Sequence, residues 1–238
     1  MCTVVVSLDP SAKIPLILIG VRDEFVDRPW IPPGEHWPGL LGGQDLQAGG
    51  TWLAVDPEAK RIGALLNGRG VLAPQETRRS RGELPLRVAA EGRLPDLDLT
   101  RYDPFHLVLA DPGGVCLWHW DGDALEEENL PTGTHMIVNS GWERGDENAR
   151  VAFFRPLFEK AGRPSGIDGS WERWQELATG AGLPDDDPRA MIIRAELPDG
   201  RVYGSLSVSL LALAADGVRY DFTGDPRDPA AFRRVLPE

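Results

Sequence analysis

The distribution of apolar residues along the chain predicts mainly β-strands. Residues 2–8 ("CTVVVSL") and 15–24 ("PLILIGVRDE") are rich in aliphatic and β-branched residues, and the turn-forming stretch "DPSAKI" separates them. Residues 51–67 repeat this arrangement around the polar turn "DPEAK". The chain is therefore expected to begin with two β-hairpins.

Further strands are expected where short apolar runs alternate with turn residues. They cover 105–111, 115–120, 124–130, 133–139, 191–197, 201–214 and 218–222, with turns such as "PGG", "DGD", "PDG" and "ADG" between several of them. We count about ten strands and three or four helices, and expect only a short tail after the last strand.

Three segments carry helical signals. Residues 82–92 predict a short helix with Pro85 near its first turn, and 147–160 and 170–180 carry apolar residues at helical spacing. Pro156 should kink or divide the second of them. Strands in runs with helices in a middle block indicate an α+β fold. We expect one domain over residues 1–238, arranged as a four-layer αββα sandwich.

Residues 29–50 are rich in Pro, Gly and Trp and are interpreted as a long loop. Long ordered loops are often functional, so this segment is expected to form a pocket wall. Trp30 and Trp37 are candidates to line an apolar substrate slot. Trp52 is a third candidate for substrate binding, although core packing is the more ordinary role for it.

The charge and the cysteine content of the chain limit which partners and which cellular compartment are expected. The 238 residues carry a formal net charge of −12 and no dense cluster of Lys and Arg, so nucleic acid and anionic membranes are not expected partners. Cys2 and Cys116 are too few for a disulfide framework or a zinc set and fit a reducing compartment. We expect a cytoplasmic protein with no signal peptide and no membrane insertion. The sequence leaves the oligomeric state open.

The cysteine that directly follows the initiator methionine is the strongest chemical candidate. If Met1 is removed, Cys2 carries both a thiol and a free α-amine, with ordinary pKa values near ~8.5 and ~8. The amine can accept the thiol proton and later protonate a leaving amine, so one residue supplies nucleophile and base. The alternative is a small buried filler at the start of a strand.

An ordered set of motifs resembles the NRDE family, the group that includes transport and Golgi organisation protein 2. These are "MC" at 1–2, "GVRDEFVDRP" at 20–29, "GGQD" at 42–45, "GGTWLAV" at 49–55, "GALLN" at 63–67, "SRGEL" at 80–84, "YDPFHLVLAD" at 102–111, "HMIVNSGWE" at 135–143 and "YGSLS" at 203–207. Each motif is weak alone, but together they span nearly the whole chain.

That family is similar to the N-terminal nucleophile hydrolases, in particular the cysteine amidases of the penicillin V acylase and bile salt hydrolase type. The resemblance implies the αββα sandwich and assigns roles. Cys2 matches the nucleophile, Arg22 the arginine beside it, and Asp23 the acid that orients the α-amine. Asn67, at the end of the fourth strand, and Asn139, at the end of strand 133–139, match the oxyanion-hole asparagines.

These assignments have structural alternatives. Arg22 and Asp23 also fit an ion pair at a strand end. Asn67 precedes Gly68 and Asn139 precedes Ser140 and Gly141, so both asparagines also fit ordinary turns.

The chain departs from the family pattern at two positions. Val21 stands where the name-giving asparagine is expected, and Leu206 replaces the arginine of a Tyr-Gly-Thr-Arg stretch. The amidases keep a second arginine late in the chain, so this charge is either absent here or supplied elsewhere.

Two functions compete. The first is an amidohydrolase that cleaves a linear C–N amide bond of a small acyl substrate through an acyl-thioester on Cys2, with no cofactor. The second is a non-catalytic protein that binds or transports haem or an acyl lipid on the same scaffold, with haem held loosely. The four histidines, His36, His106, His119 and His135, show no ligand spacing, and His119 is interpreted as an ordinary sheet histidine.

Overall fold

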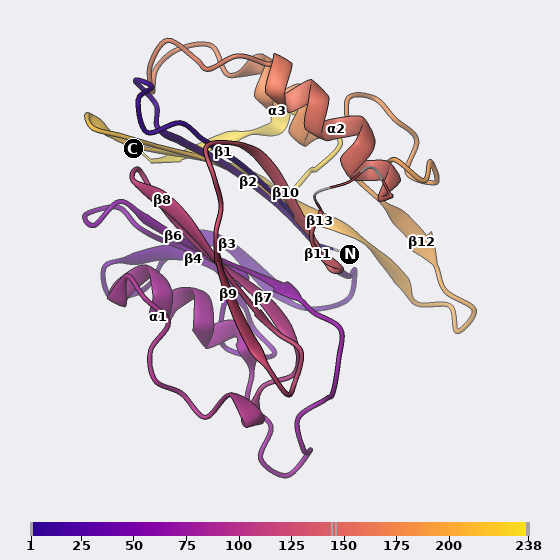
Figure 1. Ribbon diagram of the computed structural model, residues 1–238. Coiled ribbons are helices and arrows are strands. Elements are labelled where there is room, and N and C mark those ends of the chain that lie inside the picture. Colours follow the sequence, from indigo (N-terminus) through magenta and orange to yellow (C-terminus); the bar gives the residue numbers. More distant parts are fainter. Residues whose placement is uncertain (1, 144, 146, 237–238) are drawn as a thin grey trace. The chain divides into compact units, whose positions relative to one another are not determined.

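The computed structural model describes residues 2–143, 145 and 147–236 and is shown in Figure 1. Met1, whose removal the sequence argument requires, lies outside these residues. The chain forms two compact units. The first contains Met1–Arg28, Thr132–Val138 and Trp142–Glu238, and the second contains Pro29–Pro131 and Asn139–Gly141.

The first unit is built on an eight-stranded sheet in the order β11-β10-β1-β2-β13-β14-β15, with β12 paired to β13. The central strands are long and apolar, so β1 is buried along its whole length. The strands are β1 (Thr3–Leu8), β2 (Leu16–Phe25), β10 (Gly133–Val138), β11 (Gly141–Trp142), β12 (Arg194–Glu196), β13 (Val202–Ala214), β14 (Gly217–Thr223) and β15 (Arg233–Leu236).

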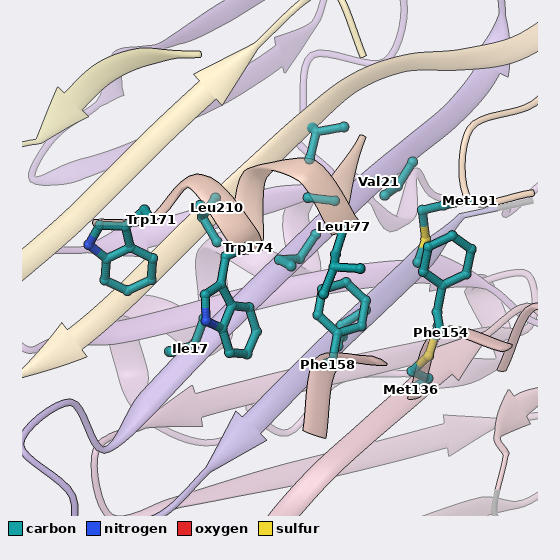
Figure 2. Packing of buried hydrophobic residues seen from close by; sticks show 14 of the residues in the cluster. Ile17, Val21, Met136, Phe154, Phe158, Trp171, Trp174, Leu177, Met191 and Leu210 are labelled. Atoms are coloured by element: carbon teal, nitrogen blue, oxygen red, sulfur yellow. The ribbon is translucent and has the colours of Figure 1, made fainter. Parts of the chain in front are cut away.

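Two helices cover one face of this sheet (Figure 1): α2 (Ala149–Lys160) and α3 (Glu172–Ala178). Asn148 caps α2, since its side chain accepts hydrogen bonds from the amides of the first turn. Figure 2 shows the core between helices and sheet, where the rings of Phe158 and Trp174 lie 5.5 Å apart. Val21 belongs to the same buried cluster, so the expected family asparagine is replaced here by a core residue.

The second unit contains a seven-stranded sheet in the order β3-β4-β5-β6-β7-β8-β9 and the helix α1 (Leu84–Glu91). The backbone of α1 approaches β6 so closely that a Cβ on Gly63 would lie 2.2 Å from the Pro85 carbonyl oxygen. The strands are β3 (Trp30–Trp37), β4 (Leu40–Asp45), β5 (Leu53–Asp56), β6 (Arg61–Asn67), β7 (Phe105–Asp111), β8 (Gly114–Trp120) and β9 (Leu125–Asn129).

The described residues also form three short 3₁₀ helices: η1 (Arg81–Glu83), η2 (Leu99–Arg101) and η3 (Pro229–Ala231). In the described part of the chain, no helix is long and apolar enough to cross a membrane.

Most of the elements predicted from the sequence are confirmed. The two N-terminal hairpins are β1–β2 and β5–β6, the three helices are α1, α2 and α3, and the meander is β7–β8–β9. The fold is α+β with mostly antiparallel strands.

The interpretation of residues 29–50 as a loop is wrong. Strands β3 and β4 pair there as a hairpin, with Gly39 at a φ of 70° in the turn. Pro32 and Pro33 argued against a strand because proline cannot donate to a β-ladder. However, β3 is the edge of its sheet, where an absent amide donor is tolerated, and its pairing with β4 is irregular at the prolines.

Pro156 does not divide its helix, because α2 runs without interruption from Ala149 to Lys160. The buried aromatic face of α2 holds the helix against the sheet despite the missing amide.

Two further expectations near the C-terminus are wrong. The strand expected over 191–197 is reduced to β12, because Met191 and Ile192 pack into the helix-facing core instead. The tail contains an additional strand, β15, which pairs with β14.

Candidate functional site

Cys2 lies at the start of β1, next to the two charged residues that the sequence singled out. Its thiol donates a weak hydrogen bond to the Asp23 carbonyl oxygen, with Sγ and O 3.6 Å apart. Thr3 pairs with Val21 across the β1–β2 ladder, so the next step of the same register places Cys2 opposite Arg22. Arg22 and Asp23 are only 4% and 3% exposed, which excludes the solvated charge run that a strand end often carries.

Asp23 is held by two side chains of β13. The Ser205 hydroxyl donates to Asp23 Oδ1 at 2.6 Å, and the Tyr203 hydroxyl donates to the Asp23 carbonyl oxygen at 3.0 Å. These bonds hold the Asp23 carboxylate and also the Asp23 carbonyl group, which accepts the hydrogen bond of the Cys2 thiol. The carboxylate is therefore rigidly placed at the end of β2.

A β-bulge distributes the serines of "YGSLS" between the two faces of the sheet. Asp23 pairs with Ser205 and Arg22 pairs with Ser207, which leaves Leu206 as the extra residue on β13. Because neighbouring residues on β2 point to opposite faces, Ser205 lies on the face of Asp23 and Ser207 on the face of Arg22. Leu206, where the family arginine is expected, therefore occupies the bulge itself.

Burial has the largest effect on the pKa values of Cys2 and Asp23. Desolvation raises the pKa of the Cys2 thiol, and the negative charge of Asp23 raises it further. The Arg22 guanidinium acts in the opposite direction, as the sequence argument expects, but it does not outweigh these effects. Burial also raises the pKa of Asp23, against the hydrogen bond from Ser205. Burial and Asp23 thus both favour the thiol over the thiolate, so attack by Cys2 calls for a base that takes its proton.

The two asparagines assigned to the oxyanion hole lie together in the second unit. The Asn139 amide nitrogen donates to the Asn67 carbonyl oxygen at 2.6 Å. Asn139 Oδ1 is buried and has no hydrogen-bond partner within the described residues, whereas the Asn67 side chain is exposed. Asn67 ends β6 and Asn139 directly follows β10, so both lie at strand ends as expected.

A pair of histidines adjoins Asn139, and the sequence argument missed it. His106 and His119 face each other across β7 and β8, with their Nδ1 atoms 2.9 Å apart. His106 Nε2 lies 3.3 Å from the Asn139 carbonyl oxygen. Burial, and then the charge of His119, lower the pKa of His106 to about 4. The sequence does allow this pairing to be predicted. Asp111 and Gly114 pair across the "PGG" turn, and counting back from Asp111 and forward from Gly114 by the same number of residues leads to His106 and His119.

The three tryptophans proposed for substrate binding divide into a pair and a single residue. Trp30 and Trp52 make an edge-to-face contact with their ring centres 5.9 Å apart. Trp52 also covers Gly43 so closely that no Cβ would fit there, which agrees with a packing role. Trp37 instead lines a hollow of about 430 Å³ with Gly49, Gly50 and Leu86.

Arg150 is a second group that sequence reasoning missed. It is 5% exposed, and its Nη1 donates to the Thr3 hydroxyl at 2.6 Å, one residue after Cys2. The sequence carries no signal for this contact, because 147 residues separate the partners.

Comparison with known proteins identifies the family. The sequence pattern described as "Transport and Golgi organisation 2" matches residues 1–179, which include Cys2, Arg22, Asp23, Asn67 and Asn139. The chain belongs to this family. It is the NRDE family that the ordered motifs indicate, and the match covers most of the chain. No curated protein matches the chain.

Among the described residues, no group of three or more His, Cys, Asp and Glu side chains is arranged to hold a metal ion. The groups present around Cys2 are its thiol, the Asp23 carboxylate, two guanidinium groups and the hydroxyls of Ser205 and Tyr203.

Proposed function

We propose that this protein is an N-terminal-cysteine amidohydrolase that acts on a linear C–N amide bond of a small acyl substrate. The observation that carries the proposal is the place of Cys2. Its sulfur lies at the start of a fully buried strand, against the backbone of Asp23 and beside Arg22. A cation beside a thiol favours the thiolate, which is the nucleophile in thiol catalysis.

The proposed reaction forms and hydrolyses a thioester. Cys2 Sγ attacks the amide carbonyl carbon while the α-amine of Cys2, freed by loss of Met1, accepts the thiol proton. The C–N bond then breaks, and the proton passes to the leaving amine. Water, deprotonated by the same amine, attacks the thioester and releases the carboxylic acid and the free thiol. This sequence requires no cofactor.

The raised pKa of the Cys2 thiol fits this mechanism. A protonated thiol needs a base at the moment of attack, and an α-amine on the same residue is within reach. In the proposed mechanism Asp23, which accepts a hydrogen bond from the Ser205 hydroxyl, orients that amine. The oxyanion roles of Asn67 and Asn139, and substrate binding by Trp30, Trp37 and Trp52, stay predictions.

The four-layer αββα sandwich and a single domain over residues 1–238 are part of the same proposal. Each unit contains one antiparallel sheet with helix packed against it, and these are the layers that such a sandwich combines. A cytoplasmic location and a small acyl or hydrophobic ligand as partner also belong to the proposal.

The test is hydrolysis of a panel of N-acyl amides by the protein and by Cys2→Ala. We expect release of amine by the unchanged protein and loss of at least about 10³-fold in rate in Cys2→Ala, since no other group replaces the nucleophile. Cys116→Ala is the matched control. It removes the other thiol, whose pKa is raised to about 12 by burial and by Glu127, and should retain full activity.

The folding of Cys2→Ala must be checked alongside its rate. Replacing one small half-buried thiol should change the free energy of unfolding by no more than about 1 kcal/mol. A large loss of stability in this variant, or equal rates in Cys2→Ala and Cys116→Ala, contradicts catalysis by Cys2. A Soret band on haem addition that Cys2→Ala abolishes, in a protein without amidase activity, supports the carrier instead.

A further inference from the structure

A buried guanidinium from α2 lies at the start of β1. Arg150 is in the first turn of the helix that Asn148 caps, and its side chain reaches the sheet to bond Thr3 Oγ1 at 2.6 Å. Thr3 directly follows Cys2 in the chain. The contact therefore ties the helix to the residue next to the proposed nucleophile.

Arg150 makes no ion pair within the described residues, and the bond to Thr3 is the only hydrogen bond of its guanidinium there. Arg219 is about equally buried, at 7% against 5%, yet it pairs with Asp221 at 2.6 Å. A buried cation without a counter-ion is costly unless nearby negative charge compensates it. The charges of Asp23, Cys2 and Tyr203 oppose the lowering of the Arg150 pKa by burial.

The strand register shows which face of the sheet this charge occupies. Thr3 pairs with Val21, a member of the helix-facing core, and Asp23 follows two residues later on the same face. Arg150 thus adds positive charge on the face of Asp23, while Arg22 lies on the opposite face. This end of the sheet carries one guanidinium on each side.

We propose that Arg150 is a positioning residue of the Cys2 site, which supplies positive charge at the start of β1 and fixes that start through Thr3. The inference rests on the proposed function. It also accounts for Leu206, because a second guanidinium reaches the site from α2 rather than from β13. Arg150 does not touch the sulfur and acts through its neighbours.

The test measures the pH dependence of Cys2 alkylation by iodoacetamide in a Cys116→Ala background. The charged or titratable neighbours are the N-terminal amine, Asp23 and Arg22 from β2, Tyr203 from β13 and Arg150 from α2, while β10 presents Val138 opposite Thr3. Arg150→Gln should move the profile to higher pH and slow alkylation at pH 7 about threefold or more, because the thiolate loses a nearby cation. Arg150→Lys should restore most of the rate.

Arg163→Gln is the matched control. Arg163 donates to Ser7 Oγ and to the Ile14 carbonyl oxygen, so its replacement removes the same charge and comparable contacts at the far end of β1. Its alkylation profile should match that of the background protein. Equal profiles for Arg150→Gln and Arg163→Gln, or failure of Arg150→Lys to restore the rate, overturn the proposal.

If Arg150→Gln does not fold, the variant Thr3→Val provides a second test. It breaks the hydrogen bond without removing the charge, and it should also move the profile to higher pH as the guanidinium loses its anchor. An unchanged profile in this variant contradicts the proposal. Absence of amide hydrolysis in the unchanged protein would count against the proposed function alone, since alkylation reports on the thiol without turnover.

Discussion

At the scale of single residues, two nearby serines of β13 differ in their hydrogen bonding. Ser205 donates to Asp23, whereas Ser207 Oγ is buried and lacks a hydrogen-bond partner in the part of the chain that the structure describes. Ser207 pairs with Arg22 in the ladder, on the face expected for Cys2. A buried hydroxyl without a hydrogen-bond partner costs stability, and here it lies in register with Arg22.

Ser207→Ala should therefore increase the free energy of unfolding by about 1 kcal/mol, because it removes a desolvated hydroxyl that gains nothing in return. Ser209→Ala is the matched control two residues along β13. Ser209 is also 1% exposed, but its hydroxyl lies 3.1 Å from the Tyr220 hydroxyl, so its loss should cost about 1–2 kcal/mol. Urea denaturation distinguishes them, and destabilisation of the same size in both variants would refute the distinction.

Sequence reasoning identified Cys2, Arg22 and Asp23, and the structure brings these residues together. All three lie on one hairpin, so their proximity follows from local register. Arg150 and Ser205 were missed because their contacts join distant segments, and no local pattern encodes them. Leu206 was recognised as a departure, but its place in a bulge depends on how β13 pairs with β2.

At the scale of elements, the close approach of helix to sheet fixes the second unit. The face of α1 made by Leu84, Pro85, Val88 and Ala89 is buried, and Gly63 on β6 provides the space for the helix backbone. The helix and the hairpin β5–β6 were predictable from their apolar periodicity. The strand β3 was not, because its prolines are compatible with pairing only at a sheet edge.

Gly63→Ala should destabilise the protein by about 1–3 kcal/mol, because the added Cβ would overlap the Pro85 carbonyl oxygen and force α1 away from β6. Gly114→Ala is the control, since no atom lies within 4 Å of a Cβ placed there on β8. Its stability should remain within about 0.5 kcal/mol of the original. Thermal or urea unfolding of both variants gives the comparison, and a neutral Gly63→Ala would show that α1 packs less tightly than described.

At the scale of the whole molecule, a buried neutral histidine links folding to pH. His106 is 1% exposed and its pKa is lowered to about 4 by burial and by His119. The unfolded chain therefore binds more protons than the folded protein between about pH 6.5 and pH 4. The contribution of His106 to stability is present at neutral pH and is lost as the pH falls through this range.

This linkage predicts that the protein loses about 2 kcal/mol of unfolding free energy through His106 between pH 7 and pH 5. In His106→Gln that part of the pH dependence should disappear. The exposed residue His36 provides the control, and His36→Gln should retain the pH dependence of the original protein. Urea unfolding at both pH values measures the difference, and an equal loss in His106→Gln would exclude His106 as its source.

The most direct test of the account is the intact mass of the protein before and after brief incubation with an N-acyl amide and acid quenching. The account predicts a chain that lacks Met1 and gains one acyl group, which Cys2→Ala does not gain and Cys116→Ala does. A chain that retains Met1, or that is acylated equally in Cys2→Ala, would contradict catalysis by an N-terminal cysteine.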